Sequence, residues 1–302
     1  MSRPQYSCTI LGANGYIGRH LAYYLNQKGF RVFAYDIQPA PNPNLPAGIP
    51  YEPFDICHNY NRVNFDVDYL FVFSGITGTK NGFEQYKTFI EVNEIGLLNI
   101  LSMVKEMEKK PKIIFPSTRL VYKGMEQPLL EEAEKESKTI YAANKLACEQ
   151  YLKMFARCFG IPYTIFRICV PYGNLFDGEF SYGTIGAFLN RAKSGGAITL
   201  YGDGEIKRTL THVVSICQQI ADAMVQPESD NQIYNIAGET FSLKEVAEKI
   251  AAVYATPVTF IPWNDLDWKI ESGSTEFDGH RIESLIQINS QMSFNKWLES
   301  IK

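Results

Sequence analysis

Short apolar runs alternate with amphipathic stretches along the first 170 residues. Between the first two runs, Ile17, Leu21 and Leu25 recur at every fourth position, and Gly29 follows them. This spacing places the three side chains on one helical face and the glycine at a helix stop, so a helix of about three turns is expected. The runs themselves predict five strands, Cys8 to Gly12, Arg31 to Asp36, Tyr69 to Ser74, Lys112 to Ser117 and Tyr163 to Ile168.

The alternation of strands and helices is typical of βαβ units and predicts an α/β fold with a Rossmann-type, doubly wound parallel sheet. After Pro171 the chain becomes rich in glycine and aromatic residues. We therefore expect a larger domain over residues 1–170 and a smaller C-terminal α/β lobe over residues 171–302. The strand-like run Gln232 to Ile236 could rejoin the first sheet. The proline-rich segment Pro39 to Pro50 predicts an exposed loop.

The composition and net charge of the chain indicate which kinds of binding partner to expect. The 302 residues are 45% hydrophobic and carry a formal net charge of −4, which disfavours a nucleic acid or an anionic membrane as the main partner. Apolar runs stay below the roughly 18 residues that cross a bilayer, and the start lacks a signal-peptide pattern, so a cytoplasmic protein is expected. The scattered cysteines predict neither a disulfide framework nor a metal site, and most are expected to be buried thiols.

A glycine-rich turn follows the first predicted strand and opens the first helix. In such a turn, one glycine permits the tight bend, one lets the backbone approach a pyrophosphate, and one allows helix and strand to pack closely. The helix N-terminus would bind the phosphates. The expected cofactor-binding residues here are Gly12, Gly15, Tyr16, Ile17 and Gly18.

Two aspartates bear on which dinucleotide is bound. Asp36 ends the second predicted strand, 18 residues after Gly18, where a carboxylate accepts both ribose hydroxyls of an adenosine and repels a 2′-phosphate. NAD is therefore favoured over NADP, and residues 1–170 are expected to bind it. The alternative is that Asp36 only begins a turn. Asp55 and Ile56 could hold the adenine, although a plain turn aspartate explains Asp55 nearly as well.

A tyrosine and a lysine four residues apart lie on one face of a helix, and hydride chemistry on an alcohol needs such a base. Tyr141 and Lys145 open a predicted helix, whose core stripe we expect to be Ala147, Tyr151, Met154 and Cys158. Tyr24 and Lys28 share the spacing but end the first helix, away from the expected cofactor, and are interpreted as a chance match. Thr118 comes at the carboxyl end of a predicted strand, where ligands bind in parallel sheets. Thr118, Tyr141 and Lys145 are the predicted catalytic residues.

The Gly-x-x-Gly-x-x-Gly spacing resembles the extended short-chain dehydrogenase/reductases, and the likeness to their NAD-dependent epimerases and dehydratases continues along the chain. It is carried by FPSTRLVYKG, VNEIGLLNIL, FRICVPYGN and LYGDGEIKRTLTHV. The resemblance implies that Thr118 contacts the substrate and that Arg208 grips the diphosphate of a nucleotide sugar. It also places Ser74 and Asn93 near the cofactor and Tyr201 near the substrate. Arg281 is a weaker candidate for a phosphate contact, and the histidines are assigned no chemistry.

Departures from the family pattern limit the reaction. Dehydratases carry Asp and Glu after the catalytic threonine, whereas this chain has Arg119 and Leu120, so loss of water by that route is not expected. Val170 replaces a substrate-binding asparagine, and Thr209 and Leu210 follow Arg208 in place of Asp and Phe. Arg119 could bind an acidic sugar, but pairing with a surface carboxylate is the simpler interpretation.

These features favour a nucleotide-sugar epimerase that works through a transient ketone. A reductase of keto-sugars would need the same residues, and a non-catalytic dinucleotide-binding protein is the third alternative. The resemblance also implies a homodimer, paired through the helices that follow residues 83 and 141.

Overall fold

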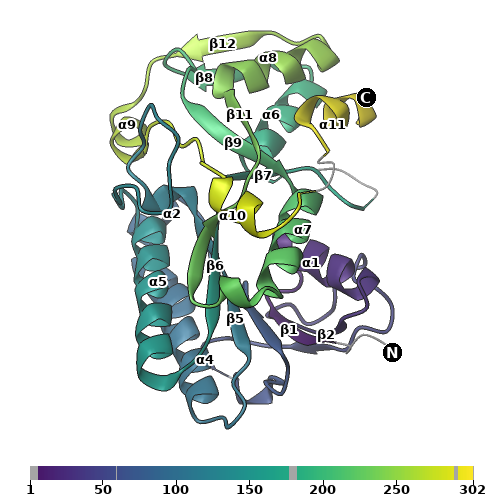
Figure 1. Ribbon diagram of the computed structural model, residues 1–302. Helices are drawn as coiled ribbons and strands as arrows, with labels where there is room; N and C mark the ends of the chain where they lie inside the picture. The colour runs from purple at the N-terminus through teal and green to yellow at the C-terminus, as the bar shows by residue number, and fades with distance from the viewer. Residues whose placement is uncertain (1–5, 59, 177–181, 289–291, 302) are drawn as a thin grey trace.

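The computed structural model describes residues 6–58, 60–176, 182–288 and 292–301. Within these ranges a seven-stranded sheet runs in the order β10-β6-β5-β4-β1-β2-β3, and all of its neighbouring strands are parallel (Figure 1). This confirms the Rossmann-type fold. The strands are β1 (Ser7–Leu11), β2 (Arg31–Asp36), β3 (Tyr51–Pro53), β4 (Tyr69–Val72), β5 (Lys112–Thr118), β6 (Tyr163–Ile168) and β10 (Gln232–Asn235).

The central strands of this sheet are buried on both faces. Every residue of β4 and of β6 is buried, which explains why these strands appear in the sequence as continuous apolar runs rather than as alternating patterns. The five strands predicted from the sequence are all present, with ends shifted by one or two residues. Thr118 belongs to β5, so this strand carries the threonine directly to the carboxyl edge of the sheet.

Helices cover both faces of the large sheet. α1 (Tyr16–Gln27) and α7 (Val213–Met224) lie on one face, and α4 (Gly96–Lys105) and α5 (Ile140–Phe159) lie on the other (Figure 1). Leu25 and Ile220 belong to the first core, and Leu101 and Leu152 to the second. Short helical segments complete this part of the chain, η1 (Tyr60–Arg62), α2 (Asn81–Glu84), α3 (Tyr86–Ile90), the π-helical η2 (Glu91–Ile95), η3 (Arg119–Val121) and η4 (Pro227–Ser229).

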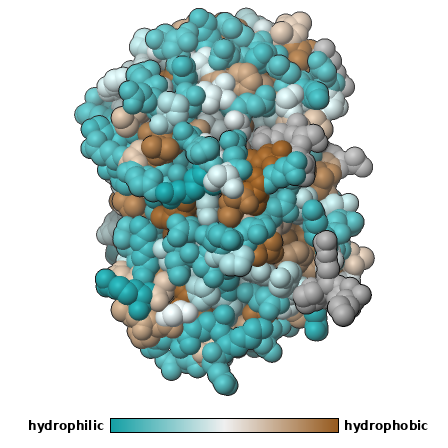
Figure 2. All heavy atoms as spheres, viewed as in Figure 1, coloured by the Kyte–Doolittle hydropathy of each residue, from teal (hydrophilic) through white to brown (hydrophobic). Residues whose placement is uncertain are grey.

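A smaller lobe lies above the carboxyl edge of the sheet, at the top of Figure 1. Its strands form two small sheets, β11-β9-β7 and β12-β8. Figure 2 shows polar residues over most of both ends of the molecule in this view, with apolar residues gathered at the waist between them. The elements here are β7 (Val170–Tyr172), α6 (Gly183–Lys193), β8 (Ile198–Tyr201), β9 (Lys207–His212), β11 (Glu239–Ser242), α8 (Leu243–Tyr254), β12 (Val258–Ile261), α9 (Asp265–Ile270), α10 (His280–Leu285) and α11 (Phe294–Ser300).

Helix α5 begins and ends where local chemistry dictates. The Thr139 side chain accepts a hydrogen bond from the backbone N–H of Ala142 at 3.1 Å, and Gly160 ends the helix in the left-handed conformation with φ of 66°. The predicted core stripe is wrong, because Met154 and Cys158 are exposed. The helix turns a different face to the sheet, with Ala142, Lys145, Cys148, Glu149 and Leu152 buried.

Four of the six cysteines are buried, as expected, and all six are free thiols. None of the helices in the described ranges has the length and apolar character needed to cross a bilayer. Over the same ranges, His, Cys, Asp and Glu side chains form no group of three that could hold a metal ion.

Candidate active site

The glycine loop forms a close-fitting cradle between β1 and α1. Gly12 has φ of +89°, and a Cβ there would lie 2.6 Å from the backbone of Phe73. A Cβ on Gly18 would lie 2.0 Å from the carbonyl oxygen of Gly12, so this glycine lets α1 approach the strand. Gly12, Gly15 and Gly18 border a cavity of about 470 Å³ together with Tyr16 and Ile17. The cradle therefore leaves room for a pyrophosphate at the start of α1.

A second hollow, of about 560 Å³, continues from this cavity beside β2. Asp36 borders it, is 8% exposed, and accepts a hydrogen bond from the backbone N–H of Asn14 at 2.9 Å. Asp55 also borders it and accepts from the backbone N–H of Cys57 at 2.8 Å. Each aspartate therefore stabilises a turn and also faces the hollow. Ile56 and Ser74 border the same hollow. The two hollows fit the two halves of a dinucleotide, with a carboxylate at the adenosine end.

The three predicted catalytic side chains border one cavity. Thr118 comes from the end of β5, and Tyr141 and Lys145 come from the start of α5. The Lys145 ammonium donates to the carbonyl oxygen of Pro116 at 2.8 Å and lies 5.9 Å from the centre of the Tyr141 ring. Among the described residues, no hydrogen bond joins the three side chains directly. They surround a space that a substrate hydroxyl can enter.

Burial shifts the acid–base behaviour of this pair in opposite directions. It raises the pKa of the Tyr141 hydroxyl above its ordinary value, and the nearby Tyr182 and Cys148 add to the rise. It lowers the pKa of Lys145 to about 8, against the opposing effects of Cys148 and Glu149. Desolvation therefore disfavours the charged form of each side chain, the phenolate of Tyr141 and the ammonium of Lys145.

A buried ion pair supports the floor of the cavity. Glu149 receives two hydrogen bonds from Arg167, at 2.9 and 2.6 Å, and a third from the hydroxyl of Ser117 at 2.5 Å. The Arg167 and Glu149 side chains are at most 2% exposed. This pair fixes Ser117, the neighbour of Thr118, against the helix that carries Lys145.

Asn93 is placed beside the cofactor region without bordering either hollow. It lies in the π-helical turn η2, accepts from the backbone N–H of Ile76 at 2.8 Å, and donates to the carbonyl of the same residue at 3.1 Å. It therefore positions the loop after β4. Only Ser74 of that loop was predicted from the sequence, although its SGITG run of small residues was a signal for the whole loop. The cavity-lining residues missed include Gly75, Ile76, Thr77, Gly78, Thr79, Cys169, Tyr182, Gly183 and Thr184.

The three other predicted substrate residues belong to the smaller lobe, and none of them borders the cavity. Arg208 is 2% exposed and donates to the carboxylate of Glu271 at 2.6 Å. Its pKa is lowered to about 10, mainly by burial and then by the like charge of Arg119. Tyr201 is partly exposed and stacks on Trp263, with ring centres 5.0 Å apart.

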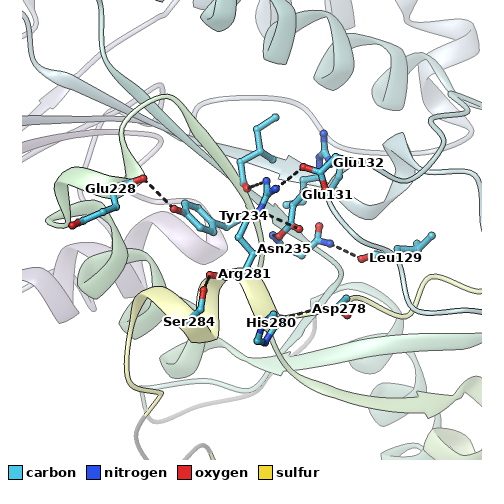
Figure 3. A network of polar contacts seen from close by, with 12 residues as sticks. Leu129, Glu131, Glu132, Glu228, Tyr234, Asn235, Asp278, His280, Arg281 and Ser284 are labelled. Atoms are coloured by element: carbon cyan, nitrogen blue, oxygen red, sulfur yellow. Dashed lines mark hydrogen bonds and ion pairs between the residues drawn. The ribbon is translucent and has the colours of Figure 1, made fainter.

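Arg281, the third, is not among the residues that line the cavity, and Figure 3 shows it in a polar network with Glu131 and Glu132. Its guanidinium donates to the carboxylate of Glu132 at 2.6 Å, and its Nε lies 3.7 Å from the carboxylate of Glu131. Tyr24 and Lys28 also lie outside the cavity, where the lysine ammonium is 5.5 Å from the tyrosine ring centre.

Arg119 does border the cavity. Its guanidinium donates to the Ser272 hydroxyl at 2.9 Å. Across residues 6–58, 60–176, 182–288 and 292–301, no carboxylate lies within 4.0 Å of it. Among these described residues, Arg119 therefore lacks the surface carboxylate partner that the simpler interpretation of the sequence expected.

A parallel sheet with a glycine cradle at its switch point, and a tyrosine–lysine pair at its carboxyl edge, defines a dinucleotide-dependent enzyme of the Rossmann class. The sequence model of the NAD dependent epimerase/dehydratase family matches residues 8–237. This chain belongs to that family, whose cofactor is NAD.

Individual relatives agree with this assignment. The chain is 31% identical to a UDP-N-acetyl-alpha-D-glucosaminuronate decarboxylase of Bacillus cytotoxicus, over 80% of this chain and 78% of the relative. It is 25% identical to a putative UDP-glucose 4-epimerase of Methanocaldococcus jannaschii, over 80% of each chain. Its fold superposes on a UDP-glucuronic acid 4-epimerase of Bacillus cereus, solved with UDP-glucuronic acid and NAD, with a TM-score of 0.82 and 20% identity over 97% of this chain and 96% of that chain.

Proposed function

We propose that this protein is an NAD-dependent nucleotide-sugar epimerase that acts through a transient keto-sugar. The observation that carries the proposal is the meeting of Thr118, Tyr141 and Lys145 at one cavity, which the glycine cradle also borders. The absence of acidic residues at positions 119 and 120 supports epimerisation over loss of water.

The side chains have separate tasks in this proposal. Tyr141 removes the proton from a sugar hydroxyl, Thr118 orients that hydroxyl, and the Lys145 ammonium stabilises the phenolate. NAD held by the cradle would supply a reversible acceptor for the hydride of the same carbon. The keto-sugar turns in the cavity so that its other face is reduced, and Tyr141 returns the proton. Over one cycle the hydride and the proton both return to the sugar, so no reagent is consumed.

Decarboxylation is a second candidate, favoured by the relative of 31% identity that carries this name. A uronate oxidised at C4 is a β-keto acid. Its C5–C6 bond can break, with CO2 leaving and the bonding electron pair forming an enolate. A proton then adds at C5 and a hydride at C4. The same tyrosine, threonine and lysine would serve both reactions.

Replacement of Tyr141 tests the proposal. The purified protein is expected to release near-stoichiometric NAD on denaturation and to interconvert C4 epimers of UDP-glucose or UDP-glucuronate. Tyr141→Phe should lower kcat by about 10²–10⁴-fold while NAD stays bound. Tyr24→Phe is the matched control, because Tyr24 has the same spacing to a lysine but lies outside the cavity, and it should keep full activity.

The products separate the alternatives. Retained turnover in Tyr141→Phe would sink the assignment of the base. Release of CO2 from a uronate would establish the decarboxylase, and net oxidation of NADH or NADPH by a keto-sugar nucleotide would establish a reductase. NAD bound without any turnover would favour the non-catalytic alternative.

A further inference from the structure

The described lining of the cavity that holds the catalytic side chains carries positive charge. Of the described residues that line it, two are cations, Arg119 and Lys145, and none is an aspartate or a glutamate. Lys145 already donates to the carbonyl oxygen of Pro116 and serves Tyr141 in the proposed reaction. Arg119 is therefore the cation in this lining whose charge the proposed reaction does not use.

The acidic side chain that is linked to Arg119 through Ser272 already has another cationic partner. Glu271 binds the guanidinium of Arg208 at 2.6 Å and also accepts from the backbone N–H of Gly273 at 3.0 Å. The hydroxyl of Ser272 donates to the same carboxylate at 3.4 Å and accepts from Arg119 at 2.9 Å. The Glu271 carboxylate thus binds Arg208 directly and reaches Arg119 only through Ser272, so the formal charges of these two guanidinium groups and one carboxylate sum to about +1. A partly buried charge of this kind attracts an anionic group of the ligand.

The position of Arg119 indicates which part of a ligand it meets. It follows Thr118 directly, so the two Cα atoms are about 3.8 Å apart. Thr118 is the residue expected at the reacting hydroxyl. For a reaction at C4 of a hexopyranose, C5 adjoins the reacting carbon and carries C6, whereas the diphosphate on C1 lies across the ring. An anion next to the reacting carbon is therefore a carboxylate at C6.

We propose that Arg119 binds the carboxylate of a uronic acid sugar, so that the preferred substrate is a nucleotide uronate. This rests on the proposed function for the presence of a nucleotide sugar in the cavity. A guanidinium has five donors in a planar fork, and Ser272 uses only one of them. The fork matches a carboxylate in a bidentate geometry, while the hydroxyl of Ser272 holds the side chain in place.

Binding measurements test this without any need for turnover. Titration calorimetry of NAD-loaded Tyr141→Phe compares UDP-glucuronate, UDP-glucose and UDP. UDP-glucuronate is expected to bind about 10–100-fold more tightly than UDP-glucose, the range for a charge-assisted pair. In Tyr141→Phe/Arg119→Gln the preference should fall to about threefold or less. Arg119→Met, which keeps most of the alkyl stem, should lose the preference in the same way.

A control isolates the site from general electrostatic attraction. Arg62 is an exposed cation in η1, and Arg62→Gln removes the same charge from the surface and should keep the preference for the uronate. Retained NAD content and an unchanged melting temperature identify variants that are folded.

Three outcomes would overturn the proposal. The first is equal binding of the two sugar nucleotides by Tyr141→Phe, and the second is a preference that survives both Arg119 variants. The third is an equal loss of affinity for UDP alone, which would assign Arg119 to the diphosphate. Failure of the proposed function looks different. In that case the wild-type protein turns over neither sugar, whereas a preference lost with Arg119 still supports the carboxylate site.

Discussion

Burial changes the protonation of single side chains well beyond the active site. His212 is buried between Tyr172 and Trp297, with ring centres 5.3 and 6.5 Å away. Its Nδ1 accepts a hydrogen bond from the backbone N–H of Val214 at 3.3 Å, which requires that nitrogen to be unprotonated. Burial lowers the pKa of His212 from 6.5 to about 4, so the folded protein holds the neutral ring.

Stability should therefore depend on this residue below neutral pH. Between pH 6.5 and 4 the unfolded chain binds a proton that the folded protein does not, so the free energy of unfolding falls as the pH falls. The loss from His212 amounts to about 2 kcal/mol by pH 4.5. Urea unfolding of His212→Asn at pH 7 and 4.5 should show a correspondingly smaller decline.

Exposed His280 provides the control for this experiment. His280→Asn should keep the wild-type dependence on pH. Parallel declines in the wild type and His212→Asn would contradict the assignment of a buried neutral ring.

For single residues, the sequence predicted which side chains meet at the cavity better than it predicted the ion-pair partners of other side chains. Thr118, Tyr141 and Lys145 were predictable because each stands at a fixed place in a βαβ unit, and the sheet brings those places together. The surroundings of Arg208 and Arg281 were not predictable. Their acidic partners, Glu271 and Glu132, lie 63 and 149 residues away in the chain, so only the tertiary fold selects them.

At the scale of helices and strands, the packing of α1 depends on how closely its backbone approaches the backbone of β1. Helix α1 packs against β1 through Gly18, where a Cβ would meet the Gly12 carbonyl oxygen at 2.0 Å. At Gly15, which has φ of −60°, the nearest contact of a Cβ would be 3.1 Å. The same substitution at two positions of one loop should therefore have different effects.

Gly18→Ala should lower the free energy of unfolding by about 1–3 kcal/mol, because the helix must move away from the strand. It should also lower the amount of NAD that copurifies. Gly15→Ala should stay within about 1 kcal/mol of the wild type in stability, because its backbone conformation suits alanine. Urea unfolding and quantification of released NAD check both variants. Equal stabilities would show that the loop adapts without cost.

Helices and strands could be predicted where the pattern of apolar residues allowed a single interpretation, and could not where it allowed two. The strands β4 and β6 were found because they are buried on both faces. The orientation of α5 was not, because its sheet-facing side buries Lys145 and Glu149. Charged side chains that find buried partners make a core face look polar in the sequence.

The whole molecule leaves apolar side chains exposed on the face formed by α2, α3, η2 and α5. We propose that this face pairs two copies of the chain, as the sequence resemblance implies. The exposed residues are Phe83, Tyr86, Ile90, Ile95, Met154 and Phe159.

Light scattering after size exclusion should give the mass of a dimer for the wild type. Ile90→Glu combined with Met154→Glu should give a monomer, because paired copies would bury the new charges. Ile261→Glu is the matched control, since Ile261 is exposed on β12 in the other lobe. A monomeric wild type would contradict the dimer.

The return of β10 to the large sheet has a consequence for synthesis on the ribosome. Strand β6 is buried along its whole length, and β10 covers one of its edges. Helix α7 contributes Ile216 and Ile220 to the core in which Leu21 and Leu25 of α1 lie. The nascent chain therefore cannot finish its first sheet until residue 235 has left the exit tunnel. Until then one edge of β6 has no partner strand. It stays open until β10 has been made, unless a chaperone covers it.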